Sequence, residues 1–107
     1  MRREIILAPQ AVEDLKALKA RDRAAVRDAI EQYLRYEPTR TSRSRIKRLR
    51  GMKRPQYRLR VEQARVFYDV TDEAVEVLAI VMKADAAAWL RRHGEPEGSI
   101  GGEGEPS

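Results

Sequence analysis

The chain has 107 residues, of which 42% are hydrophobic, and a formal net charge of +5. This length and composition indicate one globular domain with a single modest core. The absence of cysteine excludes a disulfide framework and a thiolate metal site. No apolar run has the length of a membrane span or the character of a signal-peptide core. We therefore expect a cytoplasmic protein without a membrane segment, and nothing in the sequence calls for a metal or another cofactor.

The N-terminal third is expected to form a short strand followed by two helices. The isoleucine-rich segment 3–8 reads as the strand, and Pro9 suits the first turn of a helix, where its missing N–H is not needed. Apolar residues then recur at helical spacing through residues 10–36, with a break expected at Arg21 and Asp22. This pattern predicts a helical hairpin that ends by Pro38. The side chains expected to face the core are Leu15, Leu18, Val26, Ile30 and Leu34.

The rest of the chain is expected to form a series of strands and one further helix. After a polar loop at 39–45, the predicted strands cover residues 46–52, 56–61, 65–70 and 75–82. The last of them is almost continuously apolar, which is typical of a central strand buried on both faces. An alanine-rich helix is predicted at 83–93. Residues 94–107 contain glycine, proline and acid but almost nothing to bury, so they are expected to be a disordered tail.

The resulting order, β-α-α-β-β-β-β-α, predicts an α+β domain over residues 1–93 with an antiparallel sheet. The helices should cover one face of this sheet and leave the other face for function. Tyr57, Leu59 and Val61 alternate with Arg58 and Arg60. If the first three face the helices, both arginines point to the functional face.

The positive charge is concentrated in one segment. Residues 40–65 contain 11 basic residues and one acidic residue, a net +10, whereas the remainder has 11 basic and 16 acidic residues, a net −5. Such a patch attracts polyanions, so we expect nucleic acid or an acidic partner, with a solvated loop as the alternative. The expected RNA or phosphate contacts are Arg45, Lys47, Arg48, Arg50, Lys53, Arg54, Arg58 and Arg60.

Arginine suits phosphate binding better than proton transfer. It binds phosphate with a planar fork but stays charged, so it is a poor base. We therefore interpret Arg58 and Arg60 as a phosphate clamp.

Several of these residues also have an ordinary structural interpretation. Arg65 could pair with Glu62 or Asp69, and Lys83 could be a surface lysine at a strand end. The other residues with an ordinary role are Trp89 as a packing residue that holds the last helix, His93 as a solvated helix end, and Tyr57 and Tyr68 as core residues.

The ordered segments LAPQAVEDLKAL, AIEQYL, KRLRGM, YRLRV, RVFYDV and VEVLAIV resemble the RelE/ParE superfamily of type II toxin–antitoxin toxins, over about residues 5–90. The resemblance implies a curved sheet with a basic concave face, growth inhibition, and neutralisation by a cognate antitoxin. Carried over by position, it implies functional roles for Arg58, Arg60, Arg65 and Lys83. The C-terminal tyrosine of many RelE-like members has no equivalent here.

Two activities follow from this resemblance. RelE-like members cleave messenger RNA on the ribosome by attack of a ribose 2′-hydroxyl on the neighbouring phosphate, which is the function we expect here. The reaction needs a base, positive charge to stabilise the phosphorane-like transition state, and an acid. The resemblance then implies that Arg65 joins Arg58 and Arg60 in the phosphate clamp, and Lys53 and Lys83 are the candidate bases. ParE-like members share the fold but inhibit DNA gyrase, and a degenerate toxin that only binds its antitoxin is a further alternative. Self-association is left open by the sequence.

Overall fold

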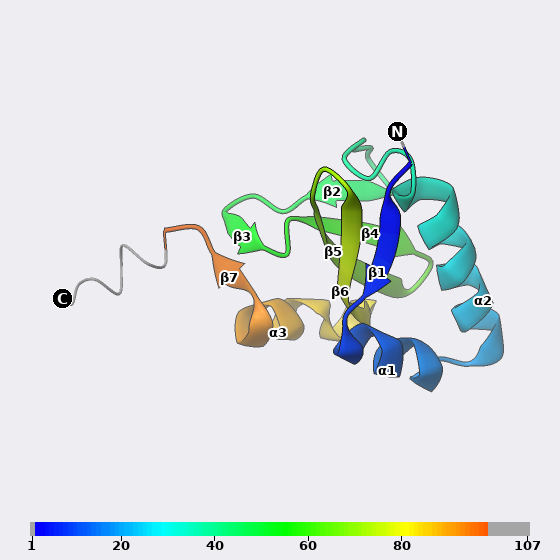
Figure 1. The fold of residues 1–107 in the computed structure, drawn as a ribbon. Helices are drawn as coiled ribbons and strands as arrows, with labels where there is room; N and C mark the ends of the chain where they lie inside the picture. The colour runs from blue at the N-terminus through cyan, green and yellow to red at the C-terminus, as the bar shows by residue number, and fades with distance from the viewer. Residues whose placement is uncertain (1, 99–107) are drawn as a thin grey trace.

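A computed structural model of the chain describes residues 2–98 and shows a five-stranded, curved, mostly antiparallel sheet (Figure 1). The strand order is β1-β6-β5-β4-β2. The sheet strands are β1 (Glu4–Leu7), β2 (Ile46–Arg48), β4 (Tyr57–Val61), β5 (Ala64–Val70) and β6 (Ala74–Met82). The predicted antiparallel ladders β2–β4–β5–β6 are confirmed, but β1 runs parallel to β6. A parallel pair needs a long crossover, and here it includes the helical hairpin and the four strands β2 to β5.

The helical hairpin consists of α1 (Pro9–Ala17) and α2 (Ala20–Ala29), and α2 continues as the π-helical turn η1 (Ile30–Leu34). The break lies at Leu18 and Lys19, which are extended, and not at Arg21 and Asp22 as expected. The side chain of Arg23 donates to the carbonyl oxygens of Leu15 at 3.3 Å and Leu18 at 2.8 Å. These bonds satisfy carbonyls at the end of α1 that have no helical partner, so the turn comes earlier than the apolar spacing predicts.

The core lies between this hairpin and one face of the sheet. The predicted core residues Leu15, Val26, Ile30 and Leu34 are buried, and Leu18 packs against them while partly exposed. They meet the apolar side chains of β4, β5 and β6, which are Leu59, Val61, Val66, Tyr68, Val75, Val77 and Ile80.

Tyr68 is a core residue, as its alternation with apolar residues predicted, and Tyr57 packs against the core while partly exposed. The two rings stack with centroids 5.5 Å apart. Tyr68 is fully buried, and its hydroxyl donates to the carbonyl oxygen of Pro38 at 2.6 Å. This bond ties β5 to the loop that follows the helical hairpin.

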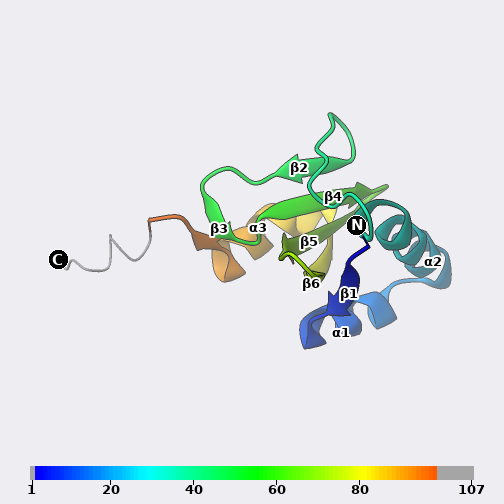
Figure 2. The ribbon, with the colours of Figure 1, turned by 45° about the horizontal axis from the view of Figure 1, so that its top comes forward.

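Helix α3 (Lys83–His93) packs on the opposite face, which corrects the expectation that all helices cover one face. It begins directly after β6, and its Trp89 stacks on Phe67 of β5. Phe67 alternates with the core residues Val66 and Tyr68, so it points away from the hairpin. Figure 2 shows α2 and α3 on different sides of the sheet. No residue of α3 is fully buried. The stack of Trp89 on Phe67 therefore marks the face of the sheet on which the helix packs.

A second, two-stranded sheet joins β3 (Met52–Arg54) to β7 (Glu95–Pro96). The predicted tail starting at Gly94 is therefore wrong for its first residues, because β7 pairs with β3 and the N–H of Glu97 donates to Gly51 at 2.7 Å. A Cβ at Gly94 would lie 2.5 Å from Met52 Cε, so glycine permits this close approach. The remainder of the predicted tail, 99–107, lies outside the described residues. Within residues 2–98, no helix is both long and apolar enough to span a bilayer.

Candidate nucleic-acid interface

The face of the sheet that points away from the α1–α2 hairpin carries the arginines of β4. Leu59 points into the core, so Arg58 and Arg60 on either side of it point to the opposite face, as predicted. Lys47 of β2 lies opposite Arg58, and Arg65 of β5 lies opposite Arg60. Directly paired residues share a face of a sheet. The register therefore brings four cationic side chains from three strands together.

Arg58, Arg60 and Arg65 form the centre of this group, which we call the arginine cluster. Among residues 2–98, none of the three forms an ion pair with a carboxylate. Burial, and then the neighbouring charge of Arg60, lowers the pKa of Arg58. Burial, and then the charges of Arg58 and Arg60, lowers the pKa of Arg65. Like charges held together without counter-ions make a site that a bound anion would stabilise.

Arg58 has a buried donor without a partner among the described residues. Its side chain is half-buried, and the buried Nε has no hydrogen-bond partner within residues 2–98. A buried donor without a partner is unfavourable.

Arg65 is held by backbone carbonyls. It is 6% exposed, and its Nη1 donates to the carbonyl oxygens of Glu62 at 2.8 Å and Ala64 at 3.0 Å. Glu62 has φ +54° in the tight β4–β5 turn, so Arg65 braces a strained turn. Of the two carboxylate partners considered in the sequence analysis, Asp69 pairs instead with Arg54. Arg65 therefore holds the β4–β5 turn in place beside the other two arginines. No carboxylate among residues 2–98 neutralises its charge.

The opposite end of the same face is acidic. Asp69 and Glu76 lie side by side on β5 and β6, and Arg54 bonds both of them, at 3.3 Å and 3.4 Å. Burial raises the pKa of Asp69, while a hydrogen bond from the N–H of Gln56 and the charge of Arg54 oppose this effect. The face thus changes from basic to acidic along β4 and β5, with Arg54 neutralised at the acidic end.

The two candidate bases are far apart in the fold. Lys53 is the central residue of β3, beside Arg54, and so lies toward the acidic end. Lys83 opens α3, and its backbone N–H donates to the carbonyl oxygen of Gln63 in the β4–β5 turn at 2.7 Å, next to Arg65. Both lysine side chains are exposed.

The remaining predicted phosphate contacts differ in their surroundings. Arg48 donates to the carbonyl oxygens of Leu49 and Gln56, both at 2.9 Å, and lies over the Tyr57 ring at 5.4 Å. These contacts give Arg48 a structural role. Arg50 is exposed in the loop before β3.

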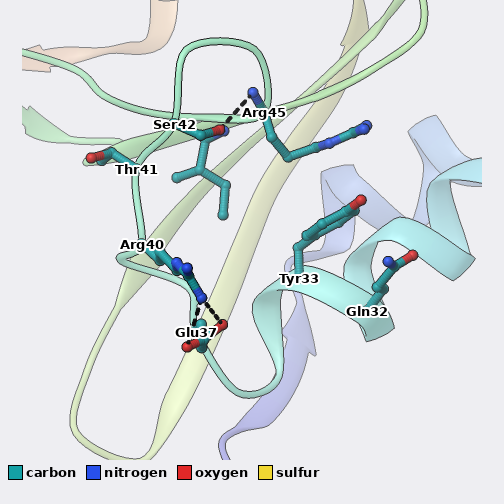
Figure 3. A pocket seen from close by; sticks show the side chains of 8 residues that line it. Gln32, Tyr33, Glu37, Arg40, Thr41, Ser42 and Arg45 are labelled. Carbon is teal, nitrogen blue, oxygen red and sulfur yellow. Dashed lines mark hydrogen bonds and ion pairs between the residues drawn. The ribbon is translucent and has the colours of Figure 1, made fainter.

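Arg45 lies at the margin of the cluster. Its guanidinium stands over the ring of Tyr33 at 4.8 Å, beside a cavity of about 200 Å³ between η1 and the loop before β2 (Figure 3). Its backbone carbonyl accepts from the N–H of Arg60 at 2.8 Å, and its Nη1 donates to the Arg60 carbonyl at 3.3 Å. The backbone of Arg45 therefore lies beside Arg60, whereas its guanidinium is turned toward Tyr33 on the side of the helical hairpin.

Two features of this face were missed by the sequence analysis. One is the contribution of Phe67, which lies opposite Arg58 and carries Trp89 on its ring. The other is the acidic pair of Asp69 and Glu76. Alternation places each of these side chains on the functional face, but only the register between strands brings them together.

The fold is similar to that of small toxins from toxin–antitoxin pairs. The RelBE2 toxin–antitoxin complex from Mycobacterium tuberculosis is similar, with a TM-score of 0.63 and 25% identity over 77% of this chain and 99% of that chain. The RelE–RelB complex from Pyrococcus horikoshii OT3 has a TM-score of 0.59 and 25% identity, over 78% and 97% of the two chains. A free E. coli RelE variant with two arginines replaced by alanine has a TM-score of 0.61 and 24% identity, over 82% and 90%.

The family is decided by the sequence match. The model of the family described as "ParE toxin of type II toxin-antitoxin system, parDE" matches residues 5–86. No curated protein sequence matches the chain. The chain belongs to the ParE toxin family of type II toxin–antitoxin systems, within the RelE/ParE superfamily.

Proposed function

We propose that this toxin acts on messenger RNA on the ribosome and binds the RNA backbone through the arginine cluster. The observation that supports this proposal is the grouping of Arg58, Arg60 and Arg65 on one face without a carboxylate partner among residues 2–98. Guanidinium groups bind phosphate oxygens in a planar fork and stay charged at physiological pH. The two structural relatives at 25% identity are RelE–RelB-type complexes, which favours the RelE-like activity.

In this proposal the cluster stabilises the negative charge that develops on phosphorus when a ribose 2′-hydroxyl attacks the neighbouring phosphate. Arg58 and Arg60 contact the phosphate, and Arg65 holds the β4–β5 turn and adds its charge. Lys83 is the better-placed candidate for the proton acceptor, because its backbone lies beside this turn whereas Lys53 lies toward the acidic end.

The protein partner in this proposal is an antitoxin. The two relatives at 25% identity are in complexes with antitoxins, and residues 40–65 carry a net charge of +10. An antitoxin with acidic residues would neutralise the arginine cluster and compete with phosphate. Its affinity should then fall as salt is raised.

A second candidate function is inhibition of DNA gyrase without nuclease activity. The specific observation in its favour is that the matching family is that of ParE toxins. In addition, the groups that could transfer a proton in RNA cleavage are not held in a site: Lys53 and Lys83 are both exposed. The hydroxyl of Tyr68 is occupied by its bond to Pro38.

Induction of the toxin without its antitoxin tests both candidates in one culture. New messenger RNA ends within coding regions support the proposed function, whereas altered plasmid supercoiling with intact RNA supports gyrase inhibition. The same culture is repeated with Arg58→Ala, Arg60→Ala and the double variant, with Arg21→Ala on the helical side as the charge-matched control. Full toxicity of the double variant would overturn phosphate binding at the cluster. Arg60→Lys should be partly defective, since lysine keeps the charge but not the fork.

A further inference from the structure

We infer that the bound RNA backbone crosses the strands, from β5 over β4 to β2, and does not run along them. This inference rests on the proposed function and specifies how the cluster would hold its substrate. It also divides the basic segment into residues that contact the RNA and residues that serve the fold.

The first support is the pattern of cross-strand rows. One row pairs Lys47 of β2 with Arg58 of β4, and the next pairs Arg60 of β4 with Arg65 of β5. Neighbouring strands lie about 4.8 Å apart, so the two rows together span roughly 10 Å from β5 to β2. Both rows are perpendicular to the strands, and together they form a continuous basic band.

The second support is the acidic end of the face. A backbone that ran along β4 and β5 would pass from the arginine cluster to Asp69 and Glu76. The charge of Arg54 is already committed to these two carboxylates, and Glu95 adds a further negative charge near Asp69. Phosphates would be repelled there, so the along-strand path is unfavourable.

The third support comes from the two sides of the band. On the β5 side, α3 covers the sheet through the stack of Trp89 on Phe67, so the band ends there. On the β2 side, β2 is the last strand of the sheet. The edge of β2 is closed by Ser42, which exchanges bonds with Ile46: its N–H donates to the Ile46 carbonyl at 2.9 Å, and its Oγ accepts from the Ile46 N–H at 3.4 Å.

The loop beyond β2 continues the positive charge. Exposed Arg43 and half-buried Arg45 lie in the segment that leads into β2. An RNA strand that leaves the cluster at this side therefore meets cationic side chains, and one that leaves toward β3 meets carboxylates. The structure offers one favourable exit.

Two lysines in matched positions separate the two paths. Lys47 is the central residue of β2 (IKR) and Lys53 the central residue of β3 (MKR), and both are exposed. A path across the strands uses Lys47, and a path along them uses Lys53. Each is replaced by alanine in the full chain, with Arg21→Ala as the background control on the helical side.

Binding of a labelled, mixed-sequence single-stranded RNA is then measured by fluorescence anisotropy over a series of salt concentrations. Each lost phosphate contact should reduce the slope of log affinity against log salt by about 0.7. Lys47→Ala is expected to show this reduction, Lys47→Arg to restore it, and Lys53→Ala to behave like Arg21→Ala. Unchanged circular dichroism and melting temperature of each variant establish that the fold is intact.

Two outcomes would overturn the inference in distinguishable ways. An effect of Lys53→Ala equal to or larger than that of Lys47→Ala would overturn the crossing path but leave RNA binding by the arginine cluster in place. If the Arg58→Ala, Arg60→Ala double variant bound the RNA as well as the unsubstituted toxin, both the path and the proposed function would fall.

Discussion

Trp89 lies flat on Phe67, with ring centroids 4.9 Å apart and ring planes inclined by 6°. Phe67 is also the cross-strand neighbour of Arg58. This aromatic contact thus packs α3 against the face that carries the arginine cluster. The stack links the position of the last helix to the surroundings of Arg58.

Replacing Trp89 by alanine should loosen α3 and lower the free energy of unfolding by about 1–3 kcal/mol, from the lost stacking and burial. Trp89→Phe keeps an aromatic ring on Phe67 and should retain most of the stability. Denaturant unfolding followed by far-UV circular dichroism measures both, because Trp89 is the only tryptophan and fluorescence is lost with it. Equal stability of Trp89→Ala and the unsubstituted chain would mean that the stack does not hold the helix.

Replacing Arg58 by methionine should raise stability at neutral pH while it weakens toxicity. Burial and the charge of Arg60 lower the pKa of Arg58, so its charged form is less favourable in the folded chain than in the unfolded chain. Neutral pH lies below the pKa of Arg58 in both the folded and the unfolded chain, so this destabilisation is fully present there. It would be lost only as the pH rises toward the pKa of arginine. Methionine keeps much of the length of the side chain without the charge.

The measurement for Arg58→Met is the denaturant midpoint at low and high salt. Added salt screens the repulsion within the arginine cluster, so it should stabilise the unsubstituted chain more than the variant. A lower midpoint for the variant at low salt would contradict this account.

Replacing Tyr68 by phenylalanine should cost about 1–3 kcal/mol, because it leaves the buried carbonyl oxygen of Pro38 without its donor. Burial, and then the neighbouring Tyr57, raises the pKa of Tyr68. The phenol therefore stays protonated as pH rises, and the loss should be the same at neutral and moderately alkaline pH. Tyr36→Phe is the matched control, since Tyr36 is 55% exposed. Chemical denaturation of the two variants at two pH values tests this prediction. A similarly small loss in the free energy of unfolding of Tyr68→Phe and Tyr36→Phe would contradict it.

Replacing Ile30 by alanine should lower the free energy of unfolding by about 2–5 kcal/mol, since it removes buried methyl groups and leaves a cavity between η1 and the sheet. Ile30 is 4% exposed, whereas Ile6 is 43% exposed and serves as the control for the same substitution. Equilibrium unfolding in urea compares the two. A cost below about 1 kcal/mol for Ile30→Ala would be too small for a core position.

The sequence by itself determined the order of the elements and the apolar stripe of the helical hairpin. It also determined which side chains of β4 point to the same face of the sheet. Each of these depends on periodicity within one segment: Ile30 and Leu34 are four residues apart on one helix, and Arg58 and Arg60 are two residues apart on one strand. Such spacings place side chains on a common face whatever the rest of the chain does. The concentration of charge in residues 40–65 was equally visible in the sequence.

Only the tertiary structure decided which charges remain available. Arg54 and Arg58 look alike in the sequence, yet Arg54 pairs with Asp69 and Glu76 while Arg58 has no carboxylate partner among residues 2–98. The face on which α3 packs was likewise decided by the contact of Trp89 with Phe67, 22 positions earlier in the chain. These outcomes depend on strand register and on contacts between distant segments, which local periodicity does not specify.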